Sequence, residues 1–149
     1  MVRICDGDLY KSDSQIIYNP VSIKNDSKFS LRVKLLYPKV YKKYTDMIFN
    51  EMVPLGEVQL VQVRQHTKQC VLNSFVYHSD GQIHRLAFVK SLVELCNIAS
   101  EYHLSVGIEY GIMQDRLWDW NIVKMIIDEV FSDTDVDVRI YRNKGQRKG

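Results

Sequence analysis

Hydrophobic residues recur every three or four positions in two long segments, as they do on one face of an amphipathic helix. The first segment runs from His84 to Tyr102, and the second follows Asp119, a residue type that often caps the start of a helix. The two apolar stripes predict two long helices, each with one face in the core. The stripes consist of Leu86, Val89, Leu92, Val93, Cys96 and Ala99, and of Ile122, Val123, Ile126, Ile127, Val130 and Phe131.

Short runs of β-branched or alternating apolar residues predict the strands of a sheet. Turn residues separate them, as at Asp6-Gly7-Asp8 and Ser12-Asp13-Ser14. A turn at His66–Lys68 is expected to join two of these strands as a pair. The expected strands cover residues 2–5, 15–18, 57–65, 69–77, 105–110 and 136–141.

Segment 29–49 has helical apolar spacing that Pro38 interrupts. Because proline lacks an amide hydrogen and clashes with the preceding turn, two short helices joined near Tyr37 are expected. The resulting order of elements predicts one α/β domain over residues 1–141, with a mixed central sheet between two helical layers (α/β/α). Ligands of such folds bind at the carboxyl ends of the strands.

The composition is typical of an ordinary globular protein, with 149 residues, of which 46% are hydrophobic and 26% charged. No apolar run approaches the roughly 20 residues that cross a bilayer. The first residues lack the basic and then apolar pattern of an export signal, so a cytoplasmic location is expected. Cys5, Cys70 and Cys96 lie far apart without a metal-binding spacing, so we expect reduced cysteines, no metal site and no cofactor.

Positive charge is concentrated in two places. Four cations in residues 142–149 more than account for the net charge of +2, and this polar segment is expected to be a flexible tail. A second group lies between Lys24 and Lys43, where Asp26 is the only acid. This second group falls where the order of elements places a ligand site.

Several segments, taken in order, resemble the macrodomain family, whose fold binds ADP-ribose. Gly7-Asp8-Leu9 and then SQIIYN at 14–19 are similar to the turn and buried second strand that open a macrodomain. The resemblance is to the small stand-alone macrodomains of phages and of DNA ADP-ribose antitoxins, and it extends over nearly the whole chain up to the tail. It is further carried by YPKVYKKY at 37–44, LGEVQLVQV at 55–63, VLNSF at 71–75 and DWNIVKMIIDEVF at 119–131.

The resemblance implies an adenine site at Asp8. In the family this acid accepts a hydrogen bond from the adenine amino group, with the backbone of the next residue, here Leu9, beside it. The alternative is that Asp8 only organises the turn. Tyr141 corresponds to an aromatic residue that lies against the adenine face, where any base can stack; packing of Tyr141 in the core is the alternative.

The two glycine-rich loops of the family are both changed here. In the first, Ser22 stands in place of an asparagine, and Lys24 and Lys28 lie where glycines would be. In the second, Gly111-Ile112 leads into MQDRLW, which includes Arg116, before the Asp-Trp pair at 119–120. Because glycine permits close approach of the backbone to phosphate, its loss predicts an altered ligand pose. The predicted ligand-binding residues are Asp8, Leu9, Ser22, Lys24, Lys28, Phe75, Gly111, Ile112, Arg116 and Tyr141.

These changes leave alternative functions open. Cationic side chains can supply the positive potential that glycine loops supply by backbone, which favours an ADP-ribose-like nucleotide as the ligand. Alternatively the chain is a degenerate macrodomain, and exposed Met113, Leu117 and Trp118 form a protein-contact patch. Weak nucleic-acid binding through residues 24–43 and the tail is a third hypothesis.

Catalysis has little support in the sequence. Some relatives remove ADP-ribose with a lysine just after the strand that here reads VLNSFVYH, and Ser74, Phe75 and Val76 offer no such nucleophile. Asp115 in a polar loop is more typical of a solvated acid than of a general base, and Cys70 lacks a histidine partner in its motif. The leading prediction is therefore a non-catalytic module that binds ADP-ribose or a related NAD-derived nucleotide, of phage origin by resemblance.

Overall fold

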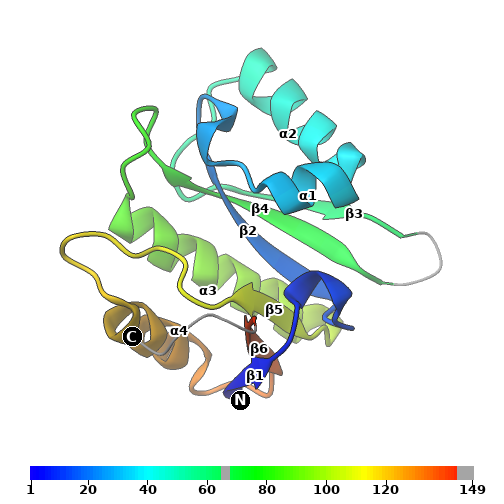
Figure 1. Cartoon of the computed structure of the whole chain (residues 1–149), viewed down its shortest axis with the longest axis vertical. Coiled ribbons are helices and arrows are strands. Elements are labelled where there is room, and N and C mark those ends of the chain that lie inside the picture. Colours follow the sequence, from blue (N-terminus) through cyan, green and yellow to red (C-terminus); the bar gives the residue numbers. More distant parts are fainter. Residues whose placement is uncertain (65–67, 144–149) are drawn as a thin grey trace.

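The computed structural model describes residues 1–64 and 68–143. Over these residues a six-stranded sheet lies between two helical layers (Figure 1). The strand order is β1-β6-β5-β2-β4-β3, and neighbours pair in parallel except for β3, which is antiparallel to β4. The described residues therefore form the predicted α/β/α arrangement with a mixed sheet.

The elements alternate along the chain as the sequence predicts. The strands are β1 (Val2–Asp6), β2 (Ile16–Ser22), β3 (Val58–Gln62), β4 (Cys70–Tyr77), β5 (Val106–Glu109) and β6 (Val138–Arg142). The helices are α1 (Leu31–Leu36), α2 (Pro38–Asn50), α3 (Arg85–Tyr102) and α4 (Trp120–Phe131), with short 3₁₀ helices η1 (Leu9–Lys11) and η2 (Asp26–Lys28).

Local signals placed the helix boundaries correctly. Asp119 caps α4, because its Oδ1 accepts a hydrogen bond from the Ile122 amide at 3.1 Å. His84 caps α3 through Nδ1, which accepts from the Ala87 amide at 3.0 Å. Pro38 begins α2 directly after α1, as its effect on the preceding turn requires.

Several strand boundaries differ from the prediction; β3, for example, ends at Gln62 and β6 begins at Val138. β2 continues past Tyr18 to Ser22. The buried Asn19 side chain can stay in the strand because its Nδ2 donates a hydrogen bond to Asn73 Oδ1 at 2.8 Å. β6 ends at Arg142, so this residue belongs to the sheet and not to the tail. Residues 144–149 of the predicted tail, and most of the turn predicted at His66–Lys68, lie outside the described residues.

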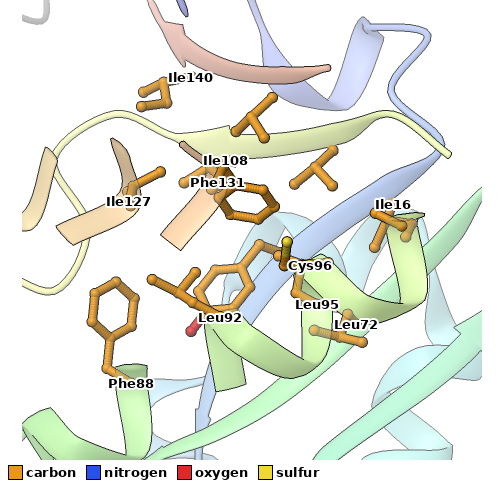
Figure 2. Packing of buried hydrophobic residues seen from close by; sticks show 14 of the residues in the cluster. Ile16, Leu72, Phe88, Leu92, Leu95, Cys96, Ile108, Ile127, Phe131 and Ile140 are labelled. Atoms are coloured by element: carbon orange, nitrogen blue, oxygen red, sulfur yellow. The ribbon is translucent and has the colours of Figure 1, made fainter. Parts of the chain in front are cut away.

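The sheet buries apolar side chains on both faces because adjacent strand residues point in opposite directions. Ile16 belongs to a large cluster with α3 and α4 (Figure 2), whereas Ile17 packs beneath α1 and α2 on the other face. Both side chains are fully buried. No helix among the described residues is long and apolar enough to cross a membrane.

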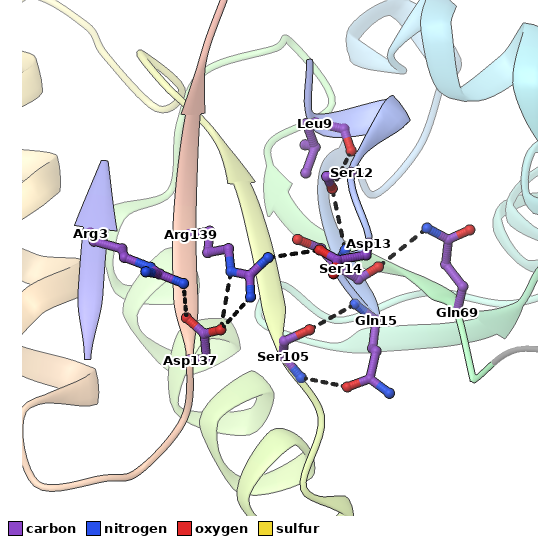
Figure 3. A network of polar contacts seen from close by, with 10 residues as sticks. All are labelled: Arg3, Leu9, Ser12, Asp13, Ser14, Gln15, Gln69, Ser105, Asp137 and Arg139. Carbon is purple, nitrogen blue, oxygen red and sulfur yellow. Dashed lines mark hydrogen bonds and ion pairs between the residues drawn. The ribbon is translucent and has the colours of Figure 1, made fainter. Parts of the chain in front are cut away.

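A polar network at the amino-terminal ends of the strands fixes the segment between β1 and β2 (Figure 3). The Gln15 amide donates to Ser105 Oγ at 3.1 Å, and the Ser105 amide donates back to Gln15 Oε1 at 3.0 Å. Arg139 donates to Asp13 Oδ1 at 2.7 Å and is also paired with Asp137. These bonds tie the segment to β5 and β6, and so set the place of η1.

Candidate functional site

The carboxyl ends of the parallel strands meet at one edge of the sheet, where the loops after β1, β2 and β5 lie. The predicted ligand residues fall into two groups along this edge. Asp8, Leu9 and Tyr141 belong to η1 and β6. The others lie at the end of β2 or after it, on β4 or in the loop at 110–119.

Asp8 is held by hydrogen bonds to both of its carboxylate oxygens. Gly7 before it has φ +136°, a conformation that glycine adopts without strain. Asp8 then caps η1, with Oδ1 accepting from the Tyr10 amide at 3.0 Å. Its Oδ2 accepts from Arg32 Nη2 at 2.9 Å, and this bond to the guanidinium is the main cause that lowers the pKa of Asp8. The turn role of Asp8 is the alternative that the sequence left open beside the adenine role, and its pairing with Arg32 was not predicted.

Arg32 joins α1 to the segment that carries Asp8. Its guanidinium carbon lies 4.9 Å from the centre of the Tyr10 ring, within the range of a cation–π contact. The Tyr10 hydroxyl in turn lies 3.4 Å from Ser30 Oγ, and Ser30 caps α1. The cation therefore sits at the place where the predicted adenine site and α1 meet.

Leu9 and Tyr141 pack together under α1. Leu9 is 3% exposed and Tyr141 is 9% exposed, and both belong to the cluster that contains Val33. The Leu9 side chain is thus a core residue, which leaves its backbone for a ligand. The burial of Tyr141 favours the alternative that this residue packs in the core. Its ring also lies beside Gly7, since a Cβ added to Gly7 would be 4.0 Å from Tyr141 Cδ1.

Glu109 is a further polar residue of this region that the sequence analysis missed. It ends β5 and lies opposite Tyr141 in the register of β5 and β6. Burial raises its pKa, an effect that the Arg32 charge opposes and the Asp8 charge reinforces. Asp8, Arg32 and Glu109 are therefore one electrostatic group built from three segments of the chain.

In the first changed loop, Ser22 has a structural role. Its side chain is buried, and its hydroxyl donates to the His78 carbonyl at 3.2 Å, linking the ends of β2 and β4. Lys24 is exposed. Lys28 reaches across to β4, where its Nζ lies 5.6 Å from the centre of the Tyr77 ring.

The Phe75 side chain is buried between β4 and α2 and is not exposed at the surface of the site. It is 0% exposed and stacks on Tyr44, with ring centres 5.8 Å apart and planes at 25°. The Tyr44 hydroxyl donates to the Ser22 carbonyl at 2.7 Å. Phe75 therefore helps to hold the start of the first loop in place through its contact with Tyr44.

The second changed loop does not expose the three apolar residues expected there. Met113 is 3% exposed, and its φ of 62° belongs to a turn that directs the side chain into the core. Trp118 packs edge-on against Phe88, with ring centres 6.1 Å apart. Only Leu117 of the three is strongly exposed, at 72%. The predicted patch of exposed Met113, Leu117 and Trp118 is therefore wrong for Met113, and Trp118 is partly buried.

Asp115 organises this loop and ties it to α3. Its Oδ1 accepts hydrogen bonds from the Leu117 and Trp118 amides, each at 2.9 Å. Its Oδ2 is bonded to Arg85, and that bond is the main cause that lowers the pKa of Asp115. The Arg85 guanidinium also lies 5.3 Å from the centre of the Trp118 ring.

A cleft of about 650 Å³ separates this loop from the turn after β4. It brings Lys28 of the first loop and Arg116 of the second to one place, together with Arg85 and Asp115. Its remaining lining residues are Tyr77, Gly81, Gln82, Ile83, Gln114 and Leu117. We call it the cation cleft, because its charged residues are three cations and one acid.

No protein-family model matches the sequence, and no curated protein matches it significantly. Solved structures do match the fold of this chain. The macrodomain of Mycobacterium tuberculosis DarG superposes with a TM-score of 0.83 at 21% identity over 97% of this chain and 99% of that one. The Thermus aquaticus DarG macrodomain gives 0.80 at 18% identity, over 95% and 98%. Thermosipho africanus DarTG, solved in complex with ADP-ribose, gives 0.79 at 16% identity, over 99% of this chain and 43% of that one.

The chain has the macrodomain fold. The structural likeness extends over nearly all of the chain, as the sequence resemblance implied. At identities of 16–21%, the structural likeness establishes the fold alone. The chemistry of the site follows from the residues of this chain.

The catalytic candidates on this macrodomain fold are poorly suited to their roles. The lowered pKa of Asp115 makes it a weaker base. Burial raises the pKa of the Cys70 thiol, which disfavours the reactive thiolate. His78 and His84 lie together, with ring centres 5.0 Å apart, but no group of three or more His, Cys, Asp or Glu among the described residues is arranged to hold a metal ion.

Proposed function

We propose that this chain binds ADP-ribose or a related NAD-derived nucleotide without turning it over. The observation that carries the proposal is the Asp8 carboxylate, held in place at the cap of η1 on a macrodomain fold. Solved neighbours of that fold include a complex of Thermosipho africanus DarTG with ADP-ribose and an Oceanobacillus iheyensis macrodomain mutant with ADPR.

The adenine end of the ligand is assigned to Asp8. Its lowered pKa keeps the carboxylate ionised at neutral pH, so it accepts hydrogen bonds and cannot donate them. An amino group fits this requirement, and the Leu9 backbone lies beside it. Each carboxylate oxygen has two lone-pair directions, so a ligand can share Oδ2 with Arg32.

The negatively charged part of the ligand is assigned to the loops after β2 and β5. Lys24, Lys28 and Arg116 supply positive potential there by side chain, which glycine loops would supply by backbone. Gly111 keeps a positive φ of 87°, and Ile112 next to it is partly buried. Ser22 and Phe75 contribute by holding the first loop in position, since both are buried.

The absence of turnover is part of the proposal. The resemblance implies a lysine just after β4 in those relatives that remove ADP-ribose; Ser74, Phe75 and Val76 near the end of this strand offer no such nucleophile, and all three are buried. The lowered pKa of Asp115 and the raised pKa of the Cys70 thiol also disfavour catalysis by these two residues. A phage origin and a cytoplasmic location stay predictions.

Isothermal titration with ADP-ribose tests the proposal. Wild-type protein should bind one equivalent, and Asp8→Asn should weaken binding about tenfold or more, because an amide keeps the Tyr10 bond but loses the charge. Asp46→Asn on α2 is the matched control: among the described residues Asp46 forms an ion pair only with its helix neighbour Lys42, so this variant should leave binding unchanged.

The other hypotheses predict different titrations. A protein-interaction module gives no heat with ADP-ribose at millimolar concentration. A nucleic-acid binder gives no heat with ADP-ribose either, but binds oligonucleotides with an affinity that falls steeply with salt. Neither outcome is compatible with the proposed nucleotide site.

A further inference from the structure

Two clefts adjoin at the amino-terminal edge of the sheet, opposite the carboxyl edge where the predicted ligand residues lie. Both clefts are lined by Gln15 and Ser105, which directly precede β2 and β5. These two residues exchange hydrogen bonds of 3.1 and 3.0 Å, so the boundary between the clefts is fixed (Figure 3). The edge is therefore divided into two halves that meet at Gln15 and Ser105.

The half of the edge between η1 and the ends of β3 and β4 is basic, and we call it the basic half. Its cleft of about 630 Å³ is lined by four cations and one acid, Lys11, Arg64, Lys68, Arg139 and Asp13. Arg139 is balanced within the chain, because it pairs with Asp13 and Asp137. The other three cations are exposed and form no ion pair with another described residue. This half therefore has an excess of positive charge.

The half of the edge beside the ends of α3 and α4 is acidic, and we call it the acidic half. Its cleft of about 490 Å³ is lined by Asp133, Asp135 and Asp137, and by no lysine or arginine among the described residues. Asp137 pairs with Arg3 and Arg139. Asp133 and Asp135 are exposed and have no such partner in the described part of the chain. The carbonyl ends of the two helices add partial negative charge to this half.

Exposed apolar side chains accompany the charges of the acidic half. Tyr102, the last residue of α3, is 59% exposed. Met1 is 77% exposed, and its carbonyl accepts a hydrogen bond from the Val138 amide at 2.9 Å, which holds Met1 at this edge. Tyrosine and methionine are enriched in protein interfaces. The edge therefore offers a protein partner apolar area as well as charge of both signs.

A partner that covers the whole edge has to carry both signs of charge. A nucleic acid fits the basic half but is repelled by Asp133 and Asp135, and an anionic membrane surface is repelled in the same way. A second copy of this chain meets both requirements, because the acidic half of one copy complements the basic half of the other. Closed two-fold dimers are also the commonest form of homo-oligomer.

We infer that the amino-terminal edge of the sheet is the interface of a two-fold symmetric dimer, with its axis near Gln15 and Ser105. Rotation about this axis places the basic half of each copy against the acidic half of the other, so the same contact forms twice. The unbalanced cations and acids then pair across the interface. The carboxyl edge of each copy stays open, so the inference does not depend on the proposed nucleotide site.

Sedimentation velocity of the full chain at neutral pH tests this inference. Wild-type protein should dimerise with a micromolar Kd in low salt, and the Kd should rise about tenfold or more in about 0.5 M salt, because exposed charges are screened. Two variants each reverse one half, Arg64→Glu/Lys68→Glu and Asp133→Lys/Asp135→Lys. Each should weaken the dimer at least about a hundredfold, because like charges then meet twice across the interface.

The matched control reverses two exposed cations that line neither cleft, Lys43 and Lys90. Lys43→Glu/Lys90→Glu changes the net charge as much as reversal of the basic half does, and it should change the Kd less than about twofold. Lys11 is kept in all variants, because its charge also lowers the pKa of Asp8. A thermal melt shows whether each variant is folded.

An equimolar mixture of the two reversed variants tests the reciprocal geometry. In the mixture the two reversed halves meet each other and the two unchanged halves meet each other, so a heterodimer should form although each variant alone is monomeric. If a reversed variant is unfolded, the neutral variants Arg64→Gln/Lys68→Gln and Asp133→Asn/Asp135→Asn decide, and each should weaken the dimer about tenfold.

A wild-type chain that stays monomeric at millimolar concentration overturns the inference, and so does a dimer that neither reversal weakens. Failure of the two folded variants to associate in the mixture rules out the reciprocal contact, and the inference with it. A failure of ADP-ribose to bind leaves the dimer interface unaffected, so this inference and the proposed function fail separately.

Discussion

Arg32 Nη2 lies 2.9 Å from Asp8 Oδ2, so the carboxylate assigned to adenine already holds a cation that comes from α1. The two residues are 24 positions apart in the chain and lie in different elements. The pair spans the predicted adenine site, and a bound base must share Asp8 with Arg32 or displace it.

The Asp8–Arg32 pair should contribute more to ligand binding than to the free energy of unfolding. The two side chains are 20% and 49% exposed, and exposed ion pairs typically contribute about 0–1 kcal/mol. A double-mutant cycle of Asp8→Asn and Arg32→Gln, measured by urea unfolding, should give a coupling within that range. A coupling of several kcal/mol would mean that losses of binding in these variants reflect unfolding.

Gly107→Ala should destabilise the protein and disturb η1. A Cβ at Gly107 would lie 2.5 Å from Leu9 Cδ1 and 2.7 Å from Ser14 Oγ, both on buried side chains. Overpacking of this kind costs about 1–3 kcal/mol. The loss is measured by denaturant unfolding; an unchanged unfolding midpoint would show that η1 is not packed on β5 as described.

Asn73 should be required inside the sheet. Its Oδ1 accepts from Asn19 and its Nδ2 donates to Gln59 Oε1 at 3.0 Å, a chain of amides across β2, β4 and β3. Asn73→Ala leaves buried partners unpaired and should cost about 1–3 kcal/mol of unfolding free energy. Asn50→Ala at the exposed end of α2 is the control and should cost less than about 1 kcal/mol.

Glu109 should give the stability of the protein a distinctive pH dependence. Its folded pKa is raised above its ordinary value, mainly by burial, so the folded state binds the proton more tightly than the unfolded state. The Glu109 contribution to stability is therefore most favourable below its unfolded pKa, and falls as pH rises through the folded pKa. Glu109→Gln should remove this part of the slope, on the alkaline side of the ordinary pKa of glutamate, in urea titrations, while Glu101→Gln, on the exposed face of α3, should not. Parallel wild-type and Glu109→Gln profiles would contradict the assignment.

The features that the sequence predicted correctly depend on neighbours in the chain. Asp119 caps α4 because the bond it accepts is to the third residue after it, and Pro38 separates two helices through its own geometry. Periodic apolar stripes likewise identify α3 and α4, since each stripe needs only some apolar surface to cover it.

The features that were missed depend on distant parts of the chain. The partner of Asp8 comes from α1, and a lone glutamate at a strand end gives no signal in the sequence that it will be partly buried and will interact with both charges. In the alternative of a protein-contact patch Met113 is expected to be exposed, but it adopts a positive φ and its side chain is buried in the core. Asn19 and Pro20 are turn residues by type, and pairing with β4 keeps them in β2.

We propose that a nucleotide binds at the carboxyl edge of this sheet, with its base at Asp8. The measurement that tests it most directly is an amide NMR titration of the wild-type protein with ADP-ribose. We predict saturable shifts that cluster at Asp8–Tyr10, at residues 22–32 and at residues 109–118. An absence of shifts at millimolar ligand, or shifts confined to the opposite edge around Gln15 and Ser105, would contradict the account.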